Sequence, residues 1–417
     1  PGATEGIAML RIAWRNLWRN STRTLVTATA IAVTYGLYLF MVGIQEFTYS
    51  QMEDAAAKAA GGSVLVQGEG FQESQLNDIL IASAHRSLAT IDATPAVLHA
   101  SPRVIINGLL STSASSAPAR LQGILPERET AFQDMEAYLT AGTFLSGPED
   151  DPIVLGAALA RELDLEIGDR VILSLTDPDG EMRRALFHLT GVLTTGSKMT
   201  DSTLAFTSLP AARKALANPD ALSQIGLLSE LPPDALAEVV RTALGETPGL
   251  EVLTWAEAMP DLVGFIEMDR AYGDVFAFIL FVVVLFAIMN TFLMVVMERV
   301  RELGLLMAIG LTPPRVALLI LLETLFLALV AMSLGLALGF AGHSIVAHWG
   351  FDMAALYGEQ MEIGGVALTD TMIYSELDAR RWFSASINVL LMVLLSAAYP
   401  AYKAMRMPPA QAMRFYE

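Results

Sequence analysis

Four long apolar segments divide this chain. A helix that crosses a bilayer needs about 20 apolar residues. The segments are 24–45 with 22 residues and 275–297 with 23 residues, both free of charge, 316–345 with Glu323 as its only charge, and 382–402. Each predicts a transmembrane helix. The first is polar at its start and lacks a small-residue cleavage site, so we expect it to be retained rather than removed as a signal peptide.

The segments outside these helices differ in length and charge. Segment 46–274 is too long for a loop, so it predicts a folded domain. It holds 14 basic and 33 acidic residues, whereas 1–23, 298–315 and 403–417 together hold ten basic and four acidic ones. Basic flanks of transmembrane helices stay in the cytoplasm. We therefore expect cytoplasmic termini, with 46–274 and the loop 346–381 outside.

Strand-like and helix-like patterns alternate within 46–274. Strands are predicted at 63–67, 103–106, 170–175 and 184–189, and helices at 157–165, 210–217 and 233–244. The turn residues of 177–180 join two of these strands into a hairpin. The small, polar stretch 111–120 predicts a loop or a junction between lobes. The expected fold class is membrane α+β, with four transmembrane helices and a large two-lobed α+β extracytoplasmic domain between helices 1 and 2.

The composition of the chain excludes several classes of function. Hydrophobic residues make up 53% of the chain and charged residues 17%, against about a quarter charged in a soluble domain. The net charge of −18 argues against a nucleic-acid partner. The chain has no cysteine, its five histidines show no metal-ligand spacing, and Gly191–Lys198 lacks the residue order of a phosphate-binding loop. We expect no catalytic, cofactor or metal site in this chain.

The N-terminal 1–23 predicts an amphipathic helix. Apolar side chains recur at helical spacing at Leu10, Trp14, Leu17 and Trp18. Arginines recur every four residues at Arg11, Arg15, Arg19 and Arg23. Such a helix lies in the cytoplasmic interface, with tryptophan at headgroup depth and arginine on lipid phosphate. A plain basic anchor is the alternative, and the two do not exclude each other.

The connector 298–315 links the second and third spans. Its charges come first, and an apolar stretch follows that Gly310 ends. Leu305, Leu306 and Ile309 are exposed unless something covers them, which predicts a docking helix for a cytoplasmic partner. The alternative is burial against the chain's own spans. The candidate coupling residues are Glu298, Arg299, Arg301, Glu302, Leu303, Gly304, Leu305, Leu306, Ile309 and Gly310.

The third span holds two further signals. Glu323 lies about 10 Å into it, and an intramembrane carboxylate is a functional candidate by default. Apart from tyrosines, the only other ionisable side chain in the spans is His343, about five turns away. We therefore expect a structural role for Glu323, protonated or hydrogen-bonded between helices, with proton coupling as the alternative. Gly335, Gly339 and Gly342 form a small-xxx-small pattern that lets helices pack closely.

The chain resembles the FtsX-like permeases of ABC transporters, a group that includes MacB-type exporters and Lol-type lipoprotein-releasing permeases. Three stretches carry the resemblance around the spans: AWRNLWRNSTRTLVT, MERVRELGLLMAIGLTPPRV and PAYKAMRMPPAQAMRFYE. Within 46–274, three more are similar to Lol-type and MacB-type ectodomains: DPIVLGAALARELDLEIGDRVIL, FHLTGVLTTGSKMTD and TWAEAMPDL. The likeness covers nearly the whole chain.

The resemblance implies a multi-pass protein of the bacterial inner membrane that works as a dimer, with a second copy or a related permease. Each permease binds a separate cytoplasmic ATPase, which holds ATP and Mg²⁺. ATP-driven closure moves the first two spans and reshapes the periplasmic domains, a mechanism called mechanotransmission. The implied function is release of lipoproteins or other hydrophobic substrates from the outer leaflet, with a periplasmic lipoprotein carrier or an outer-membrane protein as a further partner. The alternatives are MacB-type efflux of peptides or drugs and FtsX-type signalling to a cell-wall hydrolase.

Overall fold

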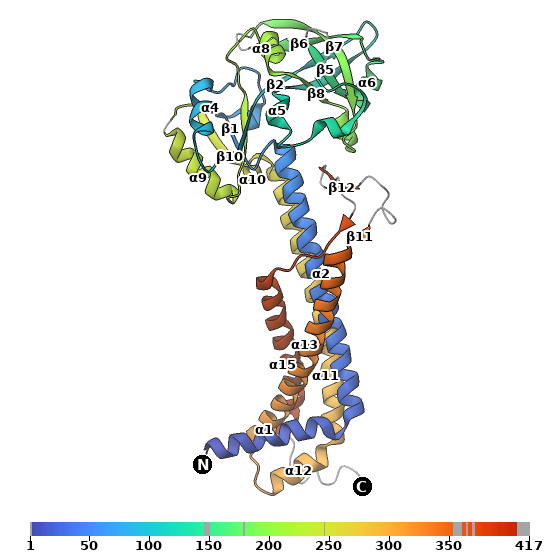
Figure 1. Ribbon diagram of the computed structural model, residues 1–417. Helices are drawn as coiled ribbons and strands as arrows, with labels where there is room; N and C mark the ends of the chain where they lie inside the picture. The colour runs from blue at the N-terminus through green and yellow to red at the C-terminus, as the bar shows by residue number, and fades with distance from the viewer. Residues whose placement is uncertain are drawn as a thin grey trace. The chain divides into compact units, whose positions relative to one another are not determined.

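The computed structural model describes residues 2–145, 151–177, 180–245, 247–352, 361–363, 366–368 and 372–406. Two compact units result (Figure 1). The first contains 1–49, 267–352 and 372–417, and the second is built on 50–266. The boundary between them falls within two long helices, α2 (Ser21–Ala60) and α11 (Pro260–Glu298).

The first unit is helical. Besides parts of α2 and α11 it contains α1 (Gly2–Arg19), α12 (Val300–Ala308), α13 (Pro313–Trp349) and α15 (Ala379–Met405). Helices α2, α11, α13 and α15 are long and apolar enough to cross a membrane, which confirms the four predicted apolar helices. They extend past the charge-free segments because helical hydrogen bonding continues into polar flanks. Helix α13 begins at a proline, which suits the first helical turn.

The core of this unit lies where α2, α13 and α15 meet. Tyr35 and Leu39 of α2 are buried with Ala328 and Ala331 of α13 and Val393 of α15. Alanine at these contacts lets the helix backbones approach one another closely. Helix α11, in contrast, leaves much of its apolar surface exposed. That surface suits lipid or another protein chain.

The second unit is built on ten paired strands, in the order β10-β1-β9-β2-β3-β8-β5-β7-β4, with β6 paired to β2 and β7. Their bounds are β1 (Val64–Gly68), β2 (His99–Ser111), β3 (Ser116–Ile124), β4 (Leu139–Gly142), β5 (Pro152–Gly156), β6 (Arg170–Thr176), β7 (Met182–Leu193), β8 (Leu204–Ser208), β9 (Gln224–Leu228) and β10 (Leu250–Thr254). The long β2 pairs with β9 through 99–103 and with β3 through 104–111. The strands and the helices that cover them bury one large apolar core.

Short helices connect these strands. They are α3 (Phe71–Ser74), α4 (Ala84–Asp92), α5 (Pro126–Glu129), the 3₁₀ turn η1 (Met135–Tyr138), α6 (Ala157–Glu162), α7 (Lys198–Asp201), α8 (Leu209–Ala215), α9 (Pro233–Leu244) and α10 (Trp255–Ala258). Two small antiparallel pairs complete the described structure: β11 (Phe351–Asp352) with β14 (Met372–Ile373), and β12 (Met361–Ile363) with β13 (Val366–Leu368).

The α+β class is confirmed, and so is the antiparallel pairing of β6 with β7. Residues 178 and 179 of the predicted turn lie outside the described residues. The prediction of a loop over 111–120 is wrong. Residues 116–120 begin β3, which pairs with β2 in a hairpin whose turn is only 112–115. Small residues such as Ala117 and Ala119 are buried in this strand rather than exposed in a loop.

Candidate functional site

The connector folds into α12 with one buried face. Val300, Leu303 and Gly304 are buried. Leu303 packs with Val316 of α13 and Ala401 of α15 in a small apolar cluster. Residues three and four positions apart lie on one side of a helix, so this face holds α12 against its own spans.

The opposite face of α12 is open. The exposed fraction is 53% for Leu305, 37% for Leu306 and 76% for Ile309. Gly310 ends the segment at a φ of 113°, a backbone conformation that favours glycine. Leu303 and Gly304 therefore pack inward, whereas the three apolar side chains and Arg301 are exposed. Docking of a partner on the exposed face stays a prediction.

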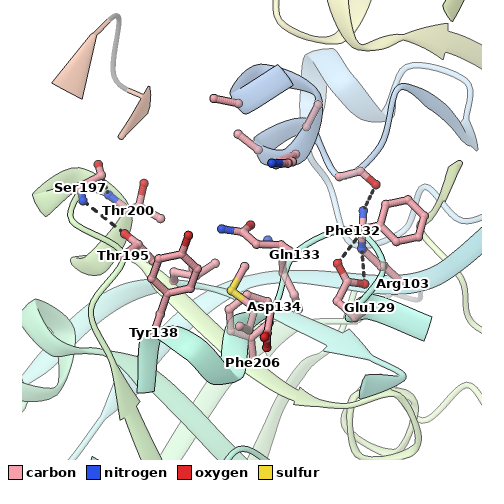
Figure 2. Close-up of a pocket in the computed structure, with 18 of the residues that line it drawn as sticks. Arg103, Glu129, Phe132, Gln133, Asp134, Tyr138, Thr195, Ser197, Thr200 and Phe206 are labelled. Atoms are coloured by element: carbon pink, nitrogen blue, oxygen red, sulfur yellow. Dashed lines mark hydrogen bonds and ion pairs between the residues drawn. The ribbon is translucent and has the colours of Figure 1, made fainter. Parts of the chain in front are cut away.

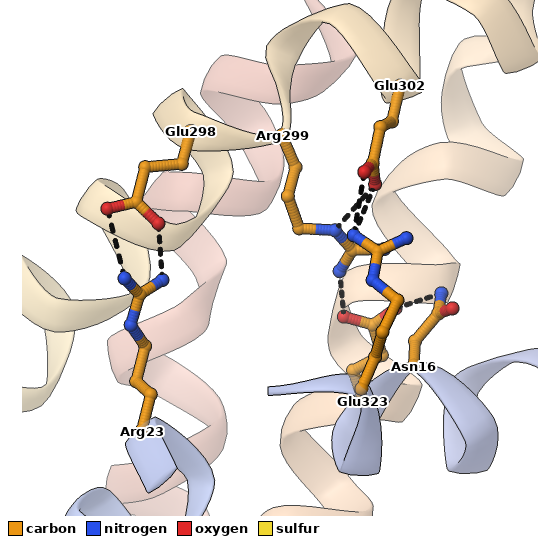
Figure 3. Close-up of polar contacts among 7 residues, drawn as sticks. Asn16, Arg23, Glu298, Arg299, Glu302 and Glu323 are labelled. Atoms are coloured by element: carbon orange, nitrogen blue, oxygen red, sulfur yellow. Dashed lines mark hydrogen bonds and ion pairs between the residues drawn. The ribbon is translucent and has the colours of Figure 1, made fainter. Parts of the chain in front are cut away.

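A cluster of ion pairs lies at the N-terminal end of α12 (Figure 3). The Arg19 guanidinium of α1 donates to both carboxylate oxygens of Glu302, at 2.6 and 2.7 Å. Arg23 of α2 pairs with Glu298 at the end of α11, at 2.5 and 3.0 Å. These contacts join α1 and α2 to both ends of the turn between α11 and α12. Sequence analysis singled out the arginines for their spacing and missed their partners.

Glu323 is the inner end of the same cluster. Its carboxylate accepts a hydrogen bond from Arg299 Nη1 at 2.8 Å and another from Asn16 Nδ2 of α1 at 2.7 Å. Arg299 Nε also donates to Glu302 at 3.2 Å, so it bridges the two glutamates. His343 lies elsewhere and contacts Ser375. Glu323 is thus hydrogen-bonded between helices, by two residues that sequence analysis did not connect to it.

Electrostatics favour ionised Glu302. Partial burial raises the pKa of this carboxyl group, but the hydrogen bonds and charges of Arg19 and Arg299 lower it by more, so the net pKa is below the ordinary value of 4.5. The carboxylate is therefore charged at neutral pH, and its pairs with both arginines persist there.

Helix α1 lies across this region with mixed contacts. Leu17 is buried in the core of the first unit, and the Trp14 ring packs edge-on against Phe326 of α13 with centroids 5.5 Å apart. Leu10, Trp14 and Trp18 remain exposed along one side. A helix with this exposed apolar side suits the membrane interface.

The glycines of α13 face α2. A Cβ atom added at Gly335 would lie 2.7 Å from the Ala32 carbonyl oxygen, and one at Gly339 would lie 3.2 Å from the Gly36 carbonyl oxygen. Gly342 lies against the Phe40 ring. Gly36 on α2 completes the contact and was not singled out from the sequence.

Over the described ranges, no three His, Asp or Glu side chains are placed to hold a metal ion. In the stretch that superficially resembles a phosphate-binding loop, Ser197 caps the short helix α7 by accepting from Thr200 N. Its hydroxyl therefore serves the local fold.

Two family models match the chain. The model described as MacB-like periplasmic core domain matches residues 24–246, more than half of the chain, and the model described as FtsX-like permease C-terminal matches 275–409. The second match contains α12 and the whole of α13.

Similar proteins carry related names. "Lipoprotein-releasing system transmembrane protein LolC" of Neisseria meningitidis serogroup B is 22% identical over 84% of this chain and 90% of that protein. "Lipoprotein-releasing system transmembrane protein LolE" of Haemophilus influenzae is 20% identical over 85% of this chain and 92% of that protein. The periplasmic region of MacB from Actinobacillus actinomycetemcomitans aligns with a TM-score of 0.34 and 15% identity, over 47% of this chain and 90% of that one. This chain belongs to the FtsX-like permeases of ABC transporters that carry a MacB-like periplasmic core domain.

Proposed function

We propose that this chain is the permease subunit of an ABC machine that releases lipoproteins or other hydrophobic substrates from the outer leaflet of the inner membrane. A separate cytoplasmic ATPase supplies the energy and holds ATP and Mg²⁺. Similarity to proteins named as lipoprotein-releasing transmembrane proteins, over more than four fifths of the chain, supports the substrate class.

The observation that carries the proposal is the open face of α12. Burial of a leucine or isoleucine side chain is worth roughly 1.5–3 kcal/mol, so three exposed apolar side chains on one short helix favour a partner protein. In the proposal this partner is the ATPase. The ion pairs of Arg19, Arg23 and Arg299 then pass its movement to α1, α2 and α13.

The proposed membrane topology follows from placing the cytoplasmic ATPase on α12. The termini and α12 are cytoplasmic, and the MacB-like domain between α2 and α11 is periplasmic and two-lobed. The exposed apolar surface of α11 faces lipid and a second permease, either a copy or a related chain. Mechanotransmission from α12 reshapes the periplasmic domain.

Reconstitution tests the function. The complex is purified from native membrane, placed in liposomes that contain a triacylated lipoprotein, and supplied with ATP and a soluble lipoprotein-binding carrier. We expect ATP-dependent transfer of the lipoprotein to the carrier and no transfer with a non-hydrolysable ATP analogue. Transfer without hydrolysis, or none with ATP in a complex that hydrolyses it, contradicts lipoprotein release.

Efflux of peptides or drugs is the second candidate, favoured by the MacB-like match over 24–246. The same liposomes distinguish it. Efflux moves a soluble, unacylated peptide in an ATP-dependent way, whereas lipoprotein release requires the acyl chains.

A further inference from the structure

The second unit contains a pocket of about 750 Å³ that the proposed function does not use. Its floor is one face of the sheet. Alternate residues of a strand point to the same side, and three neighbouring strands contribute pairs of such residues: Arg103 and Ile105, Arg120 and Gln122, Leu204 and Phe206. The pocket thus lies over β2, β3 and β8.

One of the two floor arginines has a complete set of partners. Arg103 is 2% exposed and donates from Nε and Nη2 to Glu129, at 2.9 and 2.5 Å. Its Nη1 donates to the Gly61 carbonyl oxygen at 2.6 Å, and its guanidinium lies 5.1 Å from the centre of the Phe132 ring. Figure 2 shows this group at one side of the pocket. Arg103 therefore has a structural role, and its charge is neutralised by Glu129.

Arg120 is different. Its Nε is buried without a hydrogen-bond partner. Among the described residues, its guanidinium makes no ion pair and no side-chain hydrogen bond. Burial and the neighbouring charge of Arg103 lower the pKa of Arg120, yet a guanidinium stays protonated in proteins. Arg120 is half-buried, so its charge is partly removed from water without a counter-ion, and such a residue calls for another reason to be present.

The remaining lining suits an organic molecule with one anionic group. Figure 2 shows the Tyr138 hydroxyl and the Gln133 amide pointing into the space between the Arg103 side and the Thr195 side. Hydroxyl and amide groups supply hydrogen bonds to an oxyanion, while Phe206 and Met135 supply an apolar surface. The other charged residues of the lining are Asp54, Lys58 and Asp134. They are exposed at the rim, so water screens their charges.

We propose that this pocket binds an organic molecule through a carboxylate or phosphate group, with Arg120 as the counter-ion and the apolar part of the molecule against Phe206 and Met135. The volume lies within the range of about 300–1,000 Å³ of small-molecule sites. A guanidinium matches the planar, two-oxygen edge of either anion. The site does not depend on the nature of the transported substrate.

Calorimetric titration of the full chain in nanodiscs tests the site with three probes of similar size. Phenyl phosphate and benzoate carry the two anions, and benzyl alcohol is neutral. We expect one or both anions to bind more tightly than benzyl alcohol, and the tighter one identifies the anion class. Arg120→Met should weaken anion binding at least tenfold, Arg120→Lys should weaken it less, and Arg170→Gln, an exposed arginine outside the pocket, should leave it unchanged.

Two further measurements separate a binding role from a structural one. Arg120→Met removes a half-buried charge that has no counter-ion, so the protein without added anion should melt at a temperature at least as high as the wild type. In the wild type, phenyl phosphate should protect Arg120 but not Arg170 from modification by phenylglyoxal. A lower melting temperature in Arg120→Met, unchanged anion affinity, equally tight binding of benzyl alcohol, or no protection of Arg120 would each overturn the proposal.

Discussion

Arg299 Nη1 lies 2.8 Å from Glu323 Oε2, and this ion pair ties the start of α12 to the third apolar helix. The two side chains are 18% and 13% exposed, so both charges have lost most of their water. Asn16 donates to the second carboxylate oxygen and completes the site. A charge within an apolar helix is costly when alone, and this pairing explains how Glu323 is accommodated.

A double-mutant cycle on Arg299→Gln and Glu323→Gln measures this pair. We expect each single change to destabilise the first unit and the double mutant to be less destabilised than the sum. The expected coupling is about 1–3 kcal/mol in the free energy of unfolding in detergent. The exposed pair of Arg19 and Glu302 is the control, and its coupling should be about 1 kcal/mol or less. Equal coupling of the two pairs would show that burial does not strengthen the inner one.

Acid should break the ion pairs of Glu302 with Arg19 and Arg299. Because its pKa in the folded protein is lowered, its stabilising contribution is present above the ordinary carboxyl pKa of 4.5 and is lost as the pH falls through the lowered value. Glu302→Gln should therefore melt below the wild type at pH 7 and together with it once Glu302 is protonated. Melting curves of both proteins between pH 7 and pH 3 check this. A difference that does not shrink as the pH falls would mean that the carboxylate charge is not what holds Arg19 and Arg299.

The close contact of α2 and α13 makes Gly335 sensitive to size. A methyl group there meets backbone 2.7 Å away, so we expect Gly335→Ala to destabilise by about 1–3 kcal/mol despite the better helix propensity of alanine. Gly264→Ala in α11 is the matched control, because nothing lies within 4 Å of its added Cβ, and it should be neutral or stabilising. Thermal unfolding of the two variants compares them. A stable Gly335→Ala protein would mean that the two helices separate easily.

The absence of cysteine makes the topology testable with single substitutions. Ser115→Cys lies in the turn between β2 and β3, and Thr312→Cys lies just before α13. An impermeant thiol reagent added to spheroplasts should label the first and leave the second unlabelled until the cells are lysed. Labelling of Thr312→Cys in intact spheroplasts contradicts the assigned orientation.

Part of this structure could be predicted from local pattern alone. In 298–310 the charged residues come first and the apolar residues follow. This order predicted that Leu305 and Ile309 would be exposed unless a partner covers them, because the face on which a helical side chain lies depends only on its spacing from neighbours within about one turn. The partners of Glu323 could not be found this way: Arg299 is 24 positions away and Asn16 is 307, and only packing of α1 on α13 brings them together. Arg120 was missed because the local pattern itself misleads. The small residues around it resemble a loop, although they belong to a strand that is paired along its length.

In the proposed function, the open face of α12 binds the ATPase. Leu305→Asp with Leu306→Asp places two charges on that face and leaves the buried Leu303 side untouched. The matched control is Leu76→Asp with Leu98→Asp, two exposed leucines of the second unit. Both double mutants should reach normal abundance in the membrane, because all four leucines are exposed in the folded chain.

Co-purification of the ATPase with the tagged permease is the measurement. We predict that the ATPase is lost from the Leu305→Asp, Leu306→Asp complex and retained at the wild-type ratio in the control. Wild-type ATPase binding by the α12 variant at normal permease abundance would contradict docking of the ATPase on α12 and place the coupling site elsewhere.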